Sequence, residues 1–206
     1  MSILLCMQQQ IAIAKVKYNN QIRIAIVGSH GVGKTTIVNK VNKVLHNMNY
    51  NIVAINEVFR DVYYDAQNKN TYVRKQAEDL TLSVYAKQLY LESLAKHNQQ
   101  NILTDRSVFD VFIYNNIKIG TKHYNLAKKQ AREYLNTYTK IYLIEPSSRT
   151  IEDDGFRFDT SKENQQEIHK RFIEEFKDMK NVIIINQESQ QEIIAMIIKD
   201  FNYETK

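Results

Sequence analysis

One stretch of the chain has the composition and spacing of a phosphate-binding loop. Residues 28–36 read GSHGVGKTT and fit the pattern G-x-x-x-x-G-K-[ST]. In this pattern the glycines let successive backbone N–H groups point into one concavity, and the N-terminus of the following helix adds partial positive charge. The lysine reaches the β- and γ-phosphates, and the hydroxyl of the next residue binds Mg²⁺. The predicted nucleotide-binding residues are therefore Gly28, Ser29, His30, Gly31, Val32, Gly33, Lys34, Thr35 and Thr36.

The segments on either side of the loop have the periodicity that the motif requires. Residues 21–27 form a β-branched apolar run typical of a strand, and apolar residues at steps of three and four follow over residues 37–48. Strand, glycine loop and helix in this order distinguish a nucleotide site from a glycine turn that merely joins two elements. We therefore expect ATP as the phosphate donor, with Mg²⁺ as its cofactor.

The rest of the chain alternates strand-like and helix-like segments. Further strands are predicted at residues 51–56, 101–104, 140–144 and 181–185, and helical periodicity predicts a long helix over residues 72–97. Strands this apolar are expected to be buried on both faces, which implies a five-stranded parallel sheet in a three-layer α/β/α sandwich. Ligands of such sheets bind at the carboxyl ends of the strands.

Polar residues follow the second and third predicted strands. Glu57 follows the second strand, with Arg60 one turn later, and Asp105 with Arg106 follows the third. Asp105 ends an apolar run and is the better candidate for supporting magnesium, although an aspartate before a helix also serves as a cap. Glu57 is a candidate base or substrate anchor, or else a cap or surface charge. The two arginines can donate hydrogen bonds to phosphate oxygens.

A long connection follows the fourth predicted strand. Residues 146–161 exceed an ordinary loop in length and contain Arg157. Such a segment beside a nucleotide site is typical of a lid that excludes water and brings an arginine against the transferring phosphate. A solvated loop in which Arg157 pairs with a neighbouring aspartate is the alternative. A lid would favour transfer to an acceptor over hydrolysis.

Composition limits the class of protein. The 206 residues, 43% of them hydrophobic, suit one domain over residues 21–206, with residues 1–20 as an extension or edge segment. A single cysteine, Cys6, fits a reducing cytoplasm, and no apolar run approaches the roughly 20 residues that span a bilayer, so no membrane partner is expected. The net charge of +5 is concentrated in residues 118–140, which form either a solvated helix face or a surface for phosphorylated ligands or nucleic acid.

These motifs together resemble the small P-loop kinase group. The resemblance covers about residues 21–200 and is carried by GSHGVGKTT, NEVFR, TDRSVFD, and EP followed by DDGFR. The group contains deoxynucleoside kinases, thymidylate kinases, ribosylnicotinamide kinases and related domains labelled only as ATPases, many of them encoded by phages. The REPGG signature of thymidylate kinases is missing after the second predicted strand.

The resemblance implies roles for particular residues. Glu57 is similar in position to the base that activates a hydroxyl, Asp105 and Arg106 to residues that serve metal and phosphate, and Gln88 to a helix glutamine that hydrogen-bonds a base edge. The kinase lid corresponds to Asp154, Gly155 and Arg157. The sequence lacks tryptophan, so base stacking would fall to an aromatic residue that the helical pattern otherwise places in the core: Phe59, Tyr63, Tyr85 or Phe109.

The function predicted from the sequence is ATP- and Mg²⁺-dependent phosphoryl transfer to a nucleoside or nucleoside monophosphate. The catalytic residues would be Lys34, Glu57, Arg106 and Arg157; the metal residues Thr35 and Asp105; and the substrate-binding residues Glu57, Arg60, Gln88 and Arg106. One alternative is a kinase acting on a hydroxyl or modified base in DNA or RNA. Another is an ATP-hydrolysing switch without a small acceptor. The expected location is the cytoplasm, or the host cytoplasm for a phage protein, and a homodimer is left open.

Overall fold

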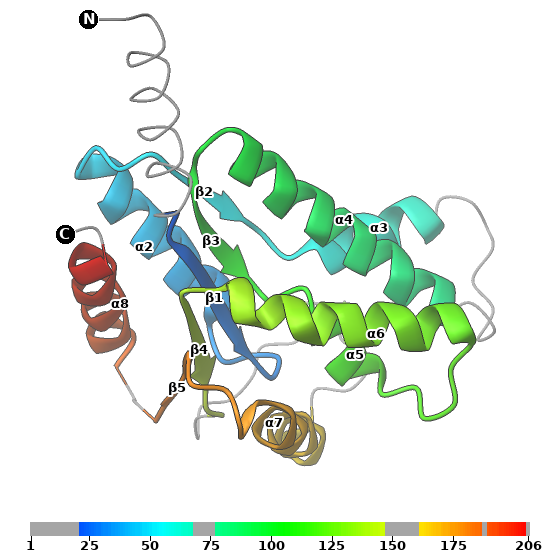
Figure 1. The fold of residues 1–206 in the computed structure, drawn as a ribbon. Coiled ribbons are helices and arrows are strands. Elements are labelled where there is room, and N and C mark those ends of the chain that lie inside the picture. The colour runs from blue at the N-terminus through cyan, green and yellow to red at the C-terminus, as the bar shows by residue number, and fades with distance from the viewer. Residues whose placement is uncertain (1–20, 68–76, 147–160, 187–188, 205–206) are drawn as a thin grey trace, which may run out of the picture.

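A five-stranded parallel sheet forms the centre of the computed structural model, which describes residues 21–67, 77–146, 161–186 and 189–204 (Figure 1). Its strands are β1 (Arg23–Gly28), β2 (Ile52–Ile55), β3 (Asn101–Asp105), β4 (Lys140–Ile144) and β5 (Val182–Ile185). They lie in the order β2-β3-β1-β4-β5, and every neighbouring pair is parallel. The predicted sheet is confirmed.

Helices cover both faces of the sheet. They are α2 (Lys34–Asn47), α3 (Val58–Gln67), α4 (Ala77–His97), α5 (Asp110–Asn115), α6 (Lys122–Tyr134), α7 (Lys162–Phe176) and α8 (Gln190–Glu204). Alternate residues of a strand point to opposite faces, so Ile24 and Ile26 pack with α2 and α8, whereas Ala25 and Val27 pack with α4 to α7. Figure 1 shows α4 and α6 on one side of β1 and α2 on the other. The predicted three-layer sandwich is therefore correct.

Burial of the strands differs between the middle and the edges of the sheet. Every residue of β1 is buried, and so is nearly every residue of β3 and β4. The edge strands β2 and β5 are only partly buried, and Ile184 of β5 is 52% exposed. The prediction that all strands are buried on both faces is wrong for these two, because an edge strand has a neighbour on one side only.

The basic stretch of residues 118–140 contains α6. Its predicted inward stripe is confirmed, since Tyr124, Ala127 and Ala131 are buried. Beside this stripe, Arg132 Nη1 donates to Glu175 Oε2 of α7 at 2.5 Å. The structure thus favours a solvated helix face with charge pairing.

The predicted start of the long helix at residue 72 and most of the lid predicted over residues 146–161 fall outside the described residues. The long helix is described from Ala77, so its predicted start at residue 72 is not tested. The helix after the predicted lid is capped by Ser161, whose hydroxyl accepts a hydrogen bond from Asn164 N at 3.2 Å. Residues 1–20 and 147–160 also lie outside the described part, which contains no helix long and apolar enough to cross a membrane.

A candidate nucleotide and acceptor site

The carboxyl ends of β1 and β3 bring the predicted phosphate loop beside Asp105. Ile26 of β1 is in register with Asp105, and Arg106 N donates to Ile26 O at 2.9 Å. After β1 the chain enters α2 on one face of the sheet, whereas after β3 it enters α5 on the other. Ligands of parallel sheets bind where neighbouring connections diverge in this way.

The phosphate loop has the backbone that its glycines allow. Gly31 and Gly33 have φ values of 75° and 84°, in the left-handed region that favours glycine. Gly28 has φ of 139°, and a Cβ there would lie 2.6 Å from Ile144 O of β4. The loop therefore approaches β4 so closely that no larger residue fits at its first position.

Lys34 is buried at the start of α2 and points back onto the loop. Its Nζ donates to Gly28 O at 3.0 Å and to Ser29 O at 2.7 Å, and the residue is 6% exposed. Burial, with the nearby positive charge of Arg106, lowers the pKa of Lys34 from 10.5 to about 8. The ammonium group is thus destabilised in this environment, and a polyphosphate would relieve that cost.

Thr35 and Asp105 place two oxygen ligands side by side. The Thr35 hydroxyl donates to Asp105 Oδ2, although the two residues lie on different elements, and Asp105 is 1% exposed. Oxygen ligands of this kind suit Mg²⁺, which keeps several waters and binds through one or two protein groups plus phosphate. Within the described residues no cluster of three or more His, Cys, Asp or Glu could hold a metal alone. The donor set therefore fits a magnesium ion shared with a nucleotide.

Glu57 and Arg106 form an ion pair at the ends of β2 and β3. Arg106 Nε donates to Glu57 Oε1 at 2.8 Å, and Arg106 Nη2 lies 2.7 Å from the same oxygen in an ion pair. Arg60 Nε donates to Glu57 Oε2 at 3.2 Å. Burial raises the pKa of Glu57, but Arg106, Lys34 and Arg60 outweigh burial and leave this pKa below its usual value. Arg106 has φ of 85° and lies 4.3 Å above the ring of Tyr114. Three of the predicted site residues are therefore in direct contact.

A pocket of about 870 Å³ lies next to the phosphate loop, between α3, α4, α5 and α7. It reaches from Lys34 and Asp105 to an apolar wall that includes Phe59 and Tyr85. Of the other two aromatic residues considered for stacking, Phe109 is in the core and Tyr63 is partly buried against Phe59 at 5.7 Å between ring centroids. The volume falls within the roughly 300–1,000 Å³ typical of small-ligand sites.

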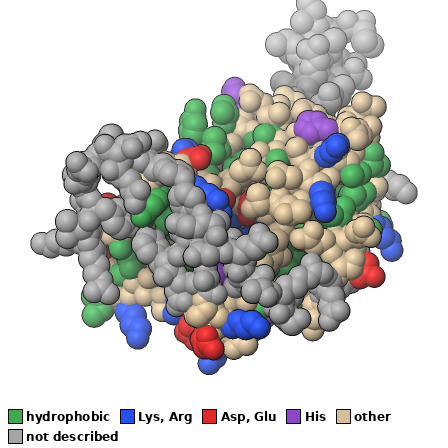
Figure 2. Space-filling view, turned by 180° about the vertical axis from the view of Figure 1, so that it is seen from behind, with side chains coloured by type: hydrophobic (Ala, Val, Ile, Leu, Met, Phe, Trp, Pro, Cys, Tyr) green, Lys and Arg blue, Asp and Glu red, His purple; other side chains and the backbone are tan. Residues whose placement is uncertain are grey.

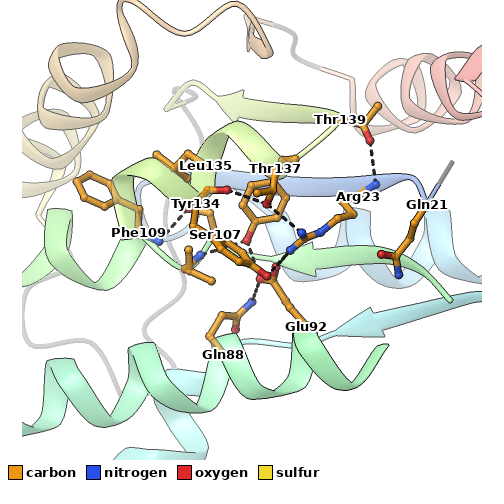
Figure 3. Close-up of polar contacts among 12 residues, drawn as sticks. Gln21, Arg23, Gln88, Glu92, Ser107, Phe109, Tyr134, Leu135, Thr137 and Thr139 are labelled. Atoms are coloured by element: carbon orange, nitrogen blue, oxygen red, sulfur yellow. Dashed lines mark hydrogen bonds and ion pairs between the residues drawn. The ribbon is translucent and has the colours of Figure 1, made fainter. Parts of the chain in front are cut away.

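Gln88 lines this pocket but also belongs to a buried polar network (Figure 3). Its Nε2 donates to Glu92 Oε1 at 2.9 Å, and Arg23 Nη2 donates to Glu92 Oε2 at 2.6 Å. Tyr138 donates its hydroxyl to Glu92 Oε1 at 2.6 Å. A carboxylate paired with arginine accepts hydrogen bonds only, so it fixes the amide nitrogen of Gln88 toward itself.

Sequence reasoning missed three residues of this region. Glu92 is fully buried and continues the stripe of Leu80, Val84 and Gln88 at steps of four, which is a signal for a buried acid. Tyr114 donates its hydroxyl to Gly28 O at 2.9 Å, and Asp110 lines the pocket. Asp110 lies three residues after Ser107, the spacing of a turn-capping aspartate. Asp154, Gly155 and Arg157 lie outside the described residues, so the lid remains a prediction.

Comparison with known proteins agrees with the loop and the fold. Residues 23–192 match the family model described as AAA domain. A solved structure of NadR protein in complex with NR is similar with a TM-score of 0.65 and 20% identity, covering 89% of this chain and 52% of that chain. NadR protein in complex with NAD and AMP-PNP gives a TM-score of 0.59 and 17% identity, covering 89% and 50%. The chain thus spans about half the length of these proteins, and the likeness is one of fold. No curated protein matches the chain.

Proposed function

Because the chain belongs to the AAA domain family, whose model matches residues 23–192, we propose that it transfers the γ-phosphate of ATP to a nucleoside or nucleoside monophosphate. The observation that carries the proposal is the pocket of about 870 Å³ beside Lys34 and Asp105. Hydrolysis needs space for one water at the γ-phosphate, whereas this pocket extends beyond the phosphate loop to residues of α3, α4 and α5 and so offers a second organic ligand a place beside the triphosphate. Its apolar wall, its ion pair and its amide side chains, Gln88 among them, are suited to a base and a sugar.

The phosphate loop supplies the donor half of the proposed reaction. Lys34 exchanges its bonds to the Gly28 and Ser29 carbonyls for the β- and γ-phosphates, and the backbone N–H groups at the start of α2 bind the remaining oxygens. Thr35 and Asp105 would hold a hydrated Mg²⁺, which would neutralise charge on the phosphates. The triphosphate is thereby fixed with its γ-phosphate toward the pocket.

The pocket supplies the acceptor half. Phe59 and Tyr85 offer aromatic surface for a base. The amide nitrogen of Gln88 is bonded to Glu92, so the amide oxygen of Gln88 is the atom offered to a base. Glu57 anchors the sugar hydroxyls, while Arg106 stabilises charge that develops on the transferred phosphate. Arg60, partly exposed, adds a cation near Glu57. The similar solved proteins hold NR in one case and NAD with AMP-PNP in the other, which supports a fold able to hold such ligands.

The lid over residues 146–161, with Arg157, belongs to the same proposal. Closure of such a segment would keep water from the γ-phosphate until an acceptor is aligned. Turnover of ATP alone should therefore be slow. The proposal also includes a cytoplasmic location and leaves the homodimer open.

Transfer of radioactive label tests the proposal. The protein is incubated with γ-labelled ATP, Mg²⁺ and separate panels of nucleosides, nucleoside monophosphates, nicotinamide riboside, and single- and double-stranded DNA and RNA. The right small acceptor should raise turnover at least about tenfold, equivalent to roughly 1.4 kcal/mol of barrier. A matched Lys34→Ala preparation identifies label that comes from contaminating kinases, since it lacks the phosphate-binding charge.

The other outcomes identify the alternatives. Label on polymer would indicate a nucleic-acid kinase, and label only in inorganic phosphate, released faster with a macromolecular partner, would indicate a switch. Lys128 and Arg132 of the basic stretch pair with Glu175, which leaves the first alternative little support from that surface. On the opposite face, shown in Figure 2, basic and acidic side chains of the described residues are interspersed. Either outcome would overturn the proposed function.

A further inference from the structure

Asp110 carries a buried carboxylate oxygen that has no hydrogen-bond partner among the described residues. The residue lies at the start of α5, lines the pocket and is 1% exposed. Its Oδ1 accepts hydrogen bonds from Ser107 N at 3.0 Å and from Ser107 Oγ at 2.6 Å. Its Oδ2 is buried and has no hydrogen-bond partner among the described residues. A buried, unpaired oxygen on an acid is costly, and native proteins rarely retain one without use.

The turn before α5 accounts for only half of this side chain. Both bonds from Ser107 go to Oδ1, so the turn needs a single acceptor oxygen at residue 110. An asparagine would supply that oxygen and would avoid the burial of a second, negatively charged one. The free Oδ2 therefore points to a role in binding or chemistry.

Glu57, the candidate base from the sequence, has both carboxylate oxygens occupied. Oε1 accepts a hydrogen bond from Arg106 Nε and forms an ion pair with its Nη2, and Oε2 accepts a hydrogen bond from Arg60. A carboxylate held by two arginines is a weak base, because proton binding would oppose both positive charges. Glu57 can anchor a hydroxyl, but it is poorly suited to remove a proton.

We propose that Asp110 accepts the proton of the acceptor's hydroxyl through its free Oδ2, and that the reacting group is a hydroxyl rather than a phosphate. This inference rests on the proposed function. The hydroxyl oxygen forms a bond to the γ-phosphorus, the bond from that phosphorus to the bridging oxygen breaks, and ADP leaves with the electron pair. The hydroxyl proton moves to Asp110.

The charges along the pocket also favour a hydroxyl. A phosphate monoester carries about −1.5 to −2 charge at neutral pH, so its attacking oxygen needs no base. The described lining has four acids and three cations, and Lys34 is taken by the triphosphate. The remaining cations, Arg60 and Arg106, already pair with Glu57. A second phosphorylated ligand would therefore have to compete with Glu57 for both arginines.

The surroundings of Asp110 set the pH range in which it can act. Burial raises its pKa to about 6, although Arg106, the bonds from Ser107 and the charge of Lys34 oppose that rise. The charged and titratable groups that act on the same site from the surrounding elements are Lys34 of α2, Glu57 after β2, Asp105 of β3, Arg106 after β3 and Tyr114 of α5. A base must be ionised, so transfer should decline as pH falls through about 6.

The test compares pH profiles of label transfer from γ-labelled ATP to an equimolar mixture of ribonucleosides, deoxyribonucleosides and nicotinamide riboside. Asp110→Asn keeps Oδ1 for Ser107 and should lower kcat by about 10²- to 10⁴-fold without weakening ATP binding. Its residual activity should lack the decline near pH 6. Glu57→Gln should retain that decline. Asp178→Asn, an exposed acid outside the pocket, is the matched control and should behave as the wild type does.

Ser107→Ala provides a second variant with a distinct readout. It removes the hydroxyl that donates to Asp110 Oδ1 at 2.6 Å and favours the ionised carboxylate. The pKa of Asp110 should therefore rise, and the loss of transfer at low pH should begin at a higher pH. Circular dichroism and an ATP-induced thermal shift establish that each variant is folded.

Three results would overturn the inference. The first is a rate of label transfer by Asp110→Asn within about threefold of the wild-type rate. The others are a loss of transfer near pH 6 that persists in Asp110→Asn, or a loss near pH 6 that disappears in Glu57→Gln. In the acceptor panels used to test the proposed function, label on nucleoside monophosphates alone would also overturn the inference while leaving the proposed function intact. Failure of the wild type to label any nucleoside or monophosphate overturns the proposed function itself. That failure needs no variant to detect.

Discussion

Replacing Lys34 with methionine should make the nucleotide-free protein more stable while removing its response to ATP. The ammonium of Lys34 is buried at the start of α2, and burial with the charge of Arg106 lowers its pKa from 10.5 to about 8. At about 1.4 kcal/mol for each tenfold change in proton affinity, the fold disfavours the charged form by about 3 kcal/mol. Methionine has a similar unbranched length and no charge.

The lost hydrogen bonds offset part of this gain. Gly28 O keeps a bond from the Tyr114 hydroxyl at 2.9 Å, but Ser29 O loses the Lys34 donor, at a cost of about 1 kcal/mol. The expected net gain is about 1–2 kcal/mol, which for a chain of this size raises Tm by about 2–8 °C. In the wild type, ATP at a hundred times its Kd adds about 2.7 kcal/mol, or about 5–10 °C.

The pH dependence has a defined sign. A lysine whose folded pKa is lowered penalises the fold fully below about pH 8, where it is charged in both states. Between pH 8 and 10.5 the unfolded state holds the proton and the folded state releases it, so the penalty fades as pH rises. The advantage of Lys34→Met should therefore be largest at neutral pH.

Thermal unfolding followed by circular dichroism, with and without Mg²⁺ and ATP, measures both effects. Lys43→Met is the matched control, because Lys43 lies on the same helix with an exposed side chain. A methionine variant that melts several degrees below the wild type at neutral pH would refute the argument that the buried charge is a cost. A variant that is still stabilised by ATP would refute the assignment of Lys34 to phosphate.

Two further predictions concern the metal and the loop. Asp105→Asn should raise the Mg²⁺ concentration needed for half-maximal turnover, because a neutral amide binds the hydrated cation more weakly; an unchanged Mg²⁺ titration would contradict the role of Asp105. Gly28→Ala should lower Tm by about 4 °C or more, equivalent to about 2 kcal/mol, because its φ of 139° disfavours alanine and its Cβ would meet Ile144 O at 2.6 Å; an unchanged melting curve would show that the loop relaxes freely.

The contact between Thr35 and Asp105 shows what could be predicted from the sequence. Two parallel strands that each end in polar residues place those residues at one edge of the sheet, so a hydroxyl after the first strand and an acid at the end of the third were expected to meet. The glycine loop needed only local pattern, because strand, loop and helix are contiguous in the chain.

The ion pair of Glu57 and Arg106 is a feature that could not be predicted from the sequence. The sequence suggested separate roles for the two residues, since nothing local states that β2 lies beside β3. Strand order follows from tertiary packing, and with it the neighbours of each charge. The free oxygen of Asp110 is beyond sequence reasoning for the same reason, because it requires a complete count of the hydrogen bonds around one side chain.

The buried network behind Gln88 constrains how this pocket could change its ligand during evolution. Gln88 supplies one of the bonds to Glu92, a carboxylate that is otherwise held by Arg23 and Tyr138. Exchange of Gln88 for a residue without a donor would leave that buried acid underbonded, at about 1–3 kcal/mol. Phe59 and Tyr85 line the same pocket and are not among the described hydrogen-bond donors to that carboxylate. New specificities should therefore arise first on the aromatic wall, with Gln88 inherited unchanged by descendants that otherwise diverge.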